Sequence, residues 1–295
     1  MKWSGNRNKK RTLHRWLAGS ILLLPSLLGV VLFVLYPLCK TFYYSMTSGL
    51  EKGCFVGLSN YISLMHNRAF WKAIRNTAVF DAIALPIIVF LPLLLAILFV
   101  RHKLMSRIFD KVVYSSILLP GAALMLFVNL LFGENGLLAQ NLSEALSAGS
   151  TNLYDSWFSF LLLIFLYVFR YGGFNYLIYC VALSRIPQEY YEEAQINGAN
   201  AAQCLWHITF PSIRPVLLVT LLLSILNSYK IYREAFLIGG YYPHDSIYMI
   251  QHFINNNFIN MNYNRLCCVA VLIILFAVCV IAFALCIERC IRREK

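Results

Sequence analysis

Long apolar runs restrict the fold of this chain more than any other feature of its sequence. They lie at about 16–39, 74–100, 112–132, 157–184, 216–239 and 266–287. Each is close to the ~20 residues that an α-helix needs to cross the hydrocarbon core of a bilayer. Of the 295 residues 60% are hydrophobic and only 13% are charged, too little polar surface for a water-soluble domain of this size. We therefore expect an all-α integral membrane protein with six transmembrane helices.

The N-terminal tail is basic and contains no acidic residue before the first apolar run. That run is longer than the apolar core of a cleaved signal peptide and lacks a small-residue cleavage site, so we expect a retained transmembrane helix. The tail is more simply a topological anchor than a nucleic-acid-binding arm. Its basic residues are Lys2, Arg7, Lys9, Lys10, Arg11 and Arg15.

The distribution of Lys and Arg predicts that both termini are cytoplasmic. Basic residues cluster after the second run and at the C-terminus, and none occurs between 133 and 157. Because cytoplasmic connections carry the excess of Lys and Arg, the even-numbered connections are expected inside. The first connection, with Lys52, Arg68 and Lys72, weakens this bias without reversing it. The two clusters are Arg101, Lys103, Arg107 and Lys111, and Arg289, Arg292, Arg293 and Lys295.

One amphipathic segment, from Ile186 to Pro215, lies between the fourth and fifth runs. Pro187 is typical of a first helical turn, and a short helix is expected to stop near Gly198. A second helix is expected over 199–207, ending before Pro211. The predicted topology places this segment on the cytoplasmic side of the membrane, where a soluble partner could bind its charged face.

Five residues of the same segment carry a recognisable spacing, namely Glu192, Ala194, Gly198, Ile208 and Pro211. Their spacing resembles the coupling loop, or EAA loop, of permease subunits of bacterial ABC importers, whose pattern is E-A-A-x-x-x-G and an apolar residue, followed by I-x-L-P. Glu193 replaces the first Ala, and Asn197 stands where sugar importers usually carry Asp. The stretch before the second run resembles the G-L-x-N-Y and F-W-x-A-x-x-N-T entry of sugar-type permeases. Its matches are Gly57, Leu58, Asn60, Tyr61, Phe70, Trp71, Asn76 and Thr77.

The resemblance covers about residues 55–285 and implies a maltose-type permease with the type I ABC importer fold. Residues 1–55 would form the tail, the first helix and the start of the external loop, and 56–295 the permease core. The resemblance also implies that the chain is a multi-pass protein of the bacterial cytoplasmic membrane. The implied partners are a second permease, usually a different chain, two ATPase subunits and an extracytoplasmic solute-binding protein. A homodimer of permeases stays open. Residues expected to contact the ATPase are Glu189, Glu192, Glu193, Ala194, Gly198, Ile208 and Pro211.

This chain contains no P-loop, so we expect no cofactor in it, with ATP and Mg²⁺ held by the partner ATPases. The sequence contains neither a nucleophile elbow nor a metal-ligand motif that would indicate an enzyme. Asp81 and Glu234 each stand alone in their runs, so they do not form a pair of catalytic acids. The resemblance implies carbohydrate as the solute. The alternatives are a permease for glycerol phosphate, a peptide or an osmolyte, or a membrane scaffold without transport activity.

Polar and aromatic residues recur along one face of the fourth run and one face of the fifth, at a similar depth. Aromatic rings suit the C–H face of a sugar, and hydroxyl and amide groups suit its hydroxyls. The alternative is packing against the partner permease. These candidate substrate-binding residues are Tyr167, Arg170, Tyr171, Phe174, Ser224, Asn227, Ser228, Lys230 and Ile231.

The charges in the fifth run allow two further interpretations. Lys230 and Glu234 are four residues apart, so they are expected to neutralise each other on one helix face. Alternatively, Arg170, Lys230 or Arg233 could bind the carboxylate of an acidic oligosaccharide. The external connection that follows, from Gly239 to Arg265, is expected to touch the binding protein. Its His244 and His252 lack metal-ligand spacing.

Overall fold

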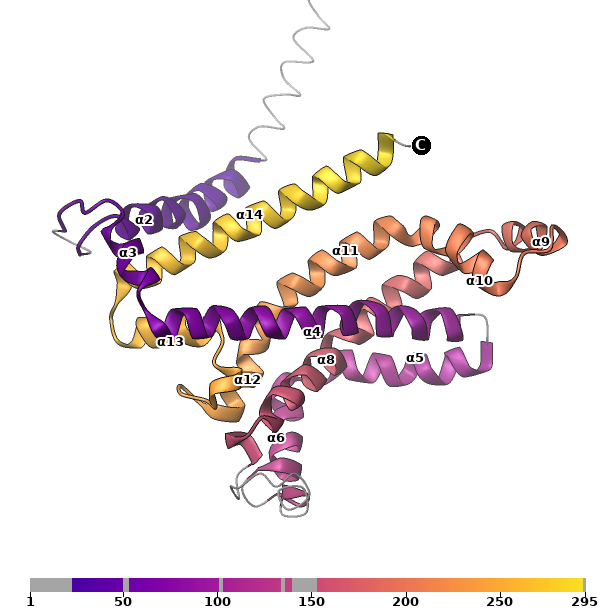
Figure 1. Ribbon diagram of the computed structural model, residues 1–295, viewed down its shortest axis with the longest axis horizontal. Coiled ribbons are helices and arrows are strands. Elements are labelled where there is room, and N and C mark those ends of the chain that lie inside the picture. Colours follow the sequence, from indigo (N-terminus) through magenta and orange to yellow (C-terminus); the bar gives the residue numbers. More distant parts are fainter. Residues whose placement is uncertain (1–22, 50–52, 101–102, 134–135, 140–152, 294–295) are drawn as a thin grey trace, which may run out of the picture. The chain divides into compact units, whose positions relative to one another are not determined.

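The computed structural model describes residues 23–49, 53–100, 103–133, 136–139 and 153–293 (Figure 1). Within these ranges the regular structure is helical, apart from one isolated bridge between Thr47 and Phe55, which confirms the all-α prediction. Five of the described helices are long and apolar enough to cross a membrane. The chain divides into two compact units, Met1–His66 with Asn257–Phe276, and Asn67–Asn256 with Ala277–Lys295.

The first unit contains the N-terminal spanning helix, described over Leu23–Ser45. It includes a π-helical turn, η1 (Val31–Leu35), and ends as α2 (Tyr36–Ser45). The expected end near residue 39 is too early. Lys40 lies within the helix and places its ammonium 5.0 Å from the centre of the Tyr36 ring, so the charge is accommodated on the helix surface.

Side-chain hydrogen bonds fix the end of this helix within the first unit. The Asn60 amide, in α3 (Ser59–Met65), donates to the carbonyl oxygens of Ser45 and Thr47 at 3.0 and 2.8 Å. The Tyr61 hydroxyl donates to Ser45 Oγ at 2.8 Å. The N-terminal part of α14 (Tyr263–Arg293) belongs to the same unit, where Cys268 donates to the Ser45 carbonyl oxygen. Asn60 and Tyr61 of the G-L-x-N-Y stretch therefore cap a transmembrane helix.

The second unit is built around α4 (Arg68–Phe99) and α8 (Phe158–Ser184), which pack against each other and cross obliquely (Figure 1). α8 matches the predicted run within one residue. α4 begins six residues before the predicted run at 74, because the Asn67 side chain accepts hydrogen bonds from the Ala69 and Phe70 N–H groups and so caps the helix.

The third predicted run is divided between two helices. These are α5 (Lys103–Leu118) and α6 (Gly121–Phe132), which meet at an angle of 100°. Pro120 lies at the bend with an extended backbone. Proline has no N–H and disfavours the helical conformation of the residue before it, so the helix cannot continue through this position. The span predicted at 112–132 is therefore not one continuous helix but a bent pair of helices.

The segment after α8 forms α9 (Gln188–Ile196), a turn, and then continuous helix over Ala201–Gly239. That helix comprises α10 (Ala201–Cys204), the π turn η3 (Leu205–Thr209), α11 (Phe210–Ser228), the 3₁₀ turn η4 (Tyr229–Ile231) and α12 (Tyr232–Gly239).

The second short helix was predicted to end before Pro211. This prediction was wrong, because the helix continues through the proline. The π turn accommodates this proline, since the Phe210 N–H bonds to the Leu205 carbonyl oxygen just before it. Ser212 Oγ then donates to the Ile208 carbonyl oxygen at 2.6 Å, so a side chain satisfies a carbonyl beside the proline. The coupling-loop region and the fifth span are consequently parts of one helix.

Three buried polar side chains of α8 connect it to its neighbours. The Tyr167 hydroxyl donates to the Ser224 carbonyl oxygen at 2.6 Å. Asn175 Nδ2 donates to the Ile88 carbonyl oxygen in α4 and to Ser224 Oγ, at 3.0 and 2.9 Å. The Tyr179 hydroxyl and Thr220 Oγ1 are 2.6 Å apart. These bonds join α4, α8 and α11 where water is excluded.

The Tyr179–Thr220 bond can be measured with a double-mutant cycle of Tyr179→Phe and Thr220→Val. Interhelical hydrogen bonds in membranes contribute about 0.6 kcal/mol on average and up to about 1.7. Because both groups are fully buried, we expect a coupling energy in the upper half of this range, measured by SDS-induced unfolding in mixed micelles. A coupling energy of zero would contradict the hydrogen bond.

Candidate functional site

The structure separates the nine candidate substrate-binding residues into two groups. Tyr167, Ser224, Ser228 and Ile231 are buried in packing within the chain. The others keep part of their surface open, and they are Arg170, Tyr171, Phe174, Asn227 and Lys230. Only the second group can touch a solute without a rearrangement of the helices.

The main charged contact among these residues is an ion pair between α8 and α12. Arg170 Nη1 lies 3.4 Å from Glu234 Oε1, and Glu234 is only 1% exposed. The expected Lys230–Glu234 pair is absent; Lys230 instead donates to Asn227 Oδ1 at 2.9 Å. The 3₁₀ turn at 229–231 has fewer residues per turn than an α-helix, which rotates Lys230 away from the face that carries Glu234.

Arg170 also lies against the beginning of α6. A Cβ added at Gly121 would overlap Arg170 Nη1, so a larger residue here would have to displace the guanidinium. The guanidinium thus contacts both α6 and α12, on opposite sides of α8 in the sequence. The sequence alone did not identify Gly121 as a neighbour of Arg170. A lone arginine in an apolar run signals only that some partner must neutralise its charge, and that partner is Glu234.

Two carboxylate oxygens in this region have no hydrogen-bond partner in the described part of the chain. They are Glu234 Oε2 and Asp81 Oδ1. A buried carboxylate oxygen without a hydrogen-bond partner is costly, so each of these two atoms marks a position where a further hydroxyl would be favourable. Asp81, on α4, was not among the predicted site residues because it stands alone in its run.

Much of the α9–α10 loop, in the segment that resembles the coupling loop, is exposed to solvent. None of the residues of α9 is buried, and Glu189, Glu192 and Glu193 are all exposed. Ala194, Gly198 and Ile208 line one cleft of roughly 290 Å³ between α9 and the following helix. Glu193 lines an adjoining cleft of roughly 390 Å³ with Ala194 and Ile208. Pro211 is exposed on the first turn of α11.

The turn between the two short helices has a backbone that favours glycine. Gly198 has a φ of +82°, and nothing lies within 4 Å of the position a Cβ would take. Glycine is therefore favoured at position 198 by the backbone conformation alone, and not by a lack of space for a side chain. After the turn, Asn200 and Gln203 form a capping box, and the Tyr191 hydroxyl lies 2.8 Å from Thr209 Oγ1. α9 is thus held against η3 in a defined geometry.

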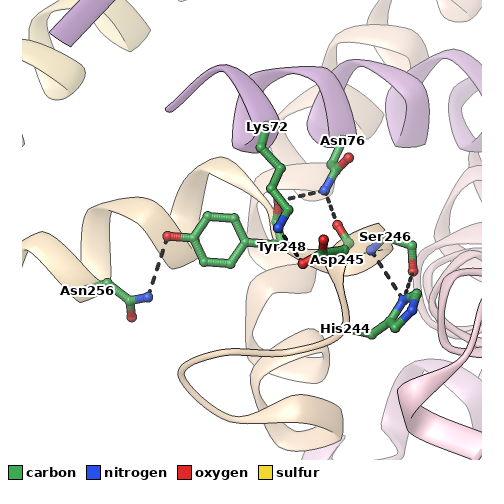
Figure 2. A network of polar contacts seen from close by, with 7 residues as sticks. All are labelled: Lys72, Asn76, His244, Asp245, Ser246, Tyr248 and Asn256. Atoms are coloured by element: carbon green, nitrogen blue, oxygen red, sulfur yellow. Dashed lines mark hydrogen bonds and ion pairs between the residues drawn. The ribbon is translucent and has the colours of Figure 1, made fainter. Parts of the chain in front are cut away.

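A polar network at the opposite end of α4 holds the loop after α12 (Figure 2). Lys72 forms an ion pair with Asp245, in η5 (Asp245–Ile247). Asn76 Nδ2 donates to the carbonyl oxygens of Asp245 and Tyr248. Beyond the network, the Ile250 N–H donates to Thr77 Oγ1 at 3.0 Å. Asn76 and Thr77, identified from the sequence as part of the F-W-x-A-x-x-N-T match, therefore anchor this loop to α4.

His252 lies fully buried beneath this loop, in α13 (Ile250–Ile259). Its Nδ1 accepts a hydrogen bond from the Met249 N–H at 3.2 Å, and its ring stacks on Tyr248. Burial lowers the pKa of His252 to about 4, because a charged imidazolium would lose its hydration there. The imidazole is therefore neutral at physiological pH. Among the described residues no group of three or more His, Cys, Asp or Glu could hold a metal.

A family model described as "binding-protein-dependent transport system inner membrane component" matches residues 53–293. The arabinooligosaccharides transport system permease protein AraP of Bacillus subtilis (strain 168) is 32% identical over 219 residues, or 72% of this chain and 69% of that protein. The probable starch degradation products transport system permease protein AmyD of Thermoanaerobacterium thermosulfurigenes is 29% identical over 234 residues, 77% of this chain and 78% of that protein.

A solved structure has the same fold. In the crystal structure of a bacterial alginate ABC transporter in complex with alginate pentasaccharide-bound periplasmic protein, one chain matches with a TM-score of 0.78. The match covers 93% of this chain and 94% of that chain at 19% sequence identity. At this identity the likeness concerns the fold alone, and it supports the predicted helical permease fold.

The Arg170–Glu234 pair predicts a charge-dependent stability. Arg170→Leu leaves Glu234 buried without its partner and should lower the free energy of unfolding by about 3 kcal/mol, near the lower end for buried pairs because Arg170 is partly exposed. Arg170→Leu combined with Glu234→Leu should recover most of this loss, because no unpaired charge remains. Unfolding in SDS-mixed micelles measures both, with the exposed Arg233→Leu as control. Equal losses for Arg170→Leu and Arg233→Leu would contradict the pair.

The buried His252 predicts a loss of stability on acidification. Its pKa in the folded state, about 4, lies below the ordinary 6.5, so its stabilising effect is complete above pH 6.5 and is lost as pH falls from 6.5 to 4. At pH 5 the loss should be roughly 2 kcal/mol. His252→Asn keeps an acceptor for the Met249 N–H but does not titrate, so it should lack this component. Parallel pH profiles of unfolding free energy for the two proteins would refute the assignment.

Proposed function

This chain belongs to the family of binding-protein-dependent transport system inner membrane components, and we propose that it is a permease subunit of an ATP-driven carbohydrate importer. Membership makes it a multi-pass protein of the bacterial cytoplasmic membrane and a transport component rather than an enzyme. Carbohydrate is supported by the relatives AraP and AmyD, whose systems carry arabinooligosaccharides and starch degradation products. The partly open tyrosine, asparagine and lysine side chains of α8 and α11–α12 suit the same class of solute.

The proposed topology has six spans with both termini in the cytoplasm. Counting the bent pair α5–α6 as one broken span raises the candidate spans from 5 to 6 in the described part of the chain. Basic residues occur near the C-terminus and between the second and third spans. They support cytoplasmic positions for the C-terminus and for that connection. On this topology the α9–α10 loop faces the cytoplasm, and the Lys72–Asp245 network faces outward.

The observation that carries the coupling role is the geometry of the α9–α10 loop. Its acidic residues are exposed, and a cleft lined by Ala194, Gly198 and Ile208 opens beside them. We assign this loop to docking on a partner ATPase, with Glu189, Glu192 and Glu193 as polar contacts and Pro211 beside the docking surface. ATP and Mg²⁺ would bind the two ATPase subunits. A second permease chain and an extracytoplasmic solute-binding protein would complete the importer.

The continuous helix over Ala201–Gly239 offers a direct mechanical path. One end carries the coupling loop, and the other carries Lys230 and Glu234 near the open side chains. A movement imposed on the loop by ATPase closure would therefore displace the side chains beside Arg170 without crossing a flexible connection. This supports alternating access by rocking of packed helices around a site within the membrane.

The coupling role is tested at Gly198 in the complex purified through a tag on this chain. Gly198→Val forces a β-branched residue into a left-handed backbone and should distort the loop without a steric clash. Gly198→Asn tolerates that conformation and serves as the matched control. We expect Gly198→Val to remain in the membrane and to lose about tenfold in ATP hydrolysis stimulated by loaded binding protein, as for coupling energies of 1–3 kcal/mol.

Two results would count against the proposal in different ways. Unchanged stimulation in Gly198→Val would remove the coupling role from this loop. A wild-type complex whose ATP hydrolysis responds to a peptide or glycerol phosphate, and to no oligosaccharide, would reject carbohydrate as the solute while leaving the importer assignment in place.

A further inference from the structure

The outer end of α4 carries basic residues that the predicted topology does not explain. Arg68, Lys72 and Arg75 are spaced i, i+4, i+7 and therefore lie on one face of the helix. The positive-inside rule places excess Lys and Arg on the cytoplasmic side, and these three lie at the proposed external end. Their position thus calls for a local explanation.

A cleft of roughly 590 Å³ opens beside this face, within the size range of small-ligand sites. It is formed by the first turns of α4, by the beginning of α8 and by η5. The indole, the two cations and the amide that line it all come from α4, while α8 contributes Phe160 and η5 contributes Asp245 and Ser246. The lining residues are Trp71, Lys72, Arg75, Asn76, Val79, Phe160, Asp245 and Ser246.

The wall of this cleft formed by η5 is fixed to α4. Figure 2 shows Lys72 and Asn76 reaching from α4 to the backbone and carboxylate of Asp245 and to the Tyr248 carbonyl oxygen. The same loop is held from its other side by Asn256, whose Nδ2 donates to the Tyr241 carbonyl oxygen at 3.0 Å. A site with walls already in place loses less entropy on binding a ligand.

The charges inside the cleft are not balanced. Asp245 neutralises Lys72, whereas Arg75 is exposed and forms no ion pair within the described part of the chain. Trp71 lies one turn before Arg75 and is 51% exposed. A guanidinium binds a carboxylate through two parallel hydrogen bonds, and an indole ring offers a flat apolar surface to the C–H face of a sugar.

We propose that this cleft is an outer subsite for an acidic saccharide unit, with the carboxylate at Arg75 and the sugar ring on Trp71. The inference rests on the proposed function, since it takes the solute to be a carbohydrate, and adds a site separate from the residues around Arg170. An acidic protein surface would also meet the cations. The cleft favours a saccharide because its aromatic side chain and cation lie in a concavity rather than on a flat patch.

The test compares trigalacturonic acid with its methyl ester, which has the same length and linkage but no charge. Binding to the purified full-length chain is measured by saturation-transfer NMR titration. Hydrogen bonds to charged groups contribute about 1.5–3 kcal/mol, so the acid should bind about tenfold or more tightly than the ester. Arg75→Gln should abolish this preference, and Arg68→Gln, on the same face but outside the cleft, should retain it. Trp71→Leu should weaken both ligands.

Equal binding of acid and ester to the wild-type chain, or a preference that survives Arg75→Gln, would overturn the subsite. Loss of binding-protein docking in Arg75→Gln, with no preference for the acid, would assign the cations to a protein contact instead. Uptake by the wild-type complex separates this inference from the proposed function. Import of neutral oligosaccharides without an acid preference rejects the subsite alone. Acid binding to the chain without any oligosaccharide import rejects the proposed function alone.

Discussion

The structure depends on how α8 satisfies its polar side chains where water is absent. Tyr167, Asn175 and Tyr179 each bond to α4 or α11, so one helix positions both neighbours. Unsatisfied polar groups in lipid are costly, so these bonds also select one register among helices whose apolar surfaces are similar. Arg170 extends the same principle to a charge, through its ion pair with Glu234 on α12 and its close approach to Gly121 on α6.

This arrangement assigns different roles to the two ends of the second unit. The α9–α10 loop is exposed, shaped by a left-handed glycine and joined directly to the helix that runs to Gly239. At the other end of α4, Asn76, Thr77 and Lys72 hold the loop that contains η5. On the proposed topology this helix joins a cytoplasmic loop to a polar site within the membrane and is suited to transmit motion, whereas the anchored loop at the other end of α4 is suited to present a fixed surface to a ligand.

The apolar runs predict every described spanning helix because length and hydropathy are local properties. α8 was predicted within one residue, and the turn at Gly198 followed from the glycine itself. The misplaced boundaries depend on nonlocal or subtle backbone effects. A π turn carries the helix past Pro211, while Pro120 bends the chain by 100°. The pairing of Arg170 with Glu234 could not be predicted from spacing, since Glu234 lies on another helix and Lys230 was the nearer partner in sequence.

The most direct test of the importer assignment is to purify the tagged chain from its native membrane in a mild detergent and identify its companions by mass spectrometry. The account predicts recovery of an ATPase, a second permease and, after cross-linking, an extracytoplasmic solute-binding protein. Substitution of the three exposed glutamates of α9 by glutamine should selectively reduce the ATPase yield, because they lie on the proposed docking surface. Recovery of the chain without any nucleotide-binding subunit, under conditions that preserve other membrane complexes, would contradict the account.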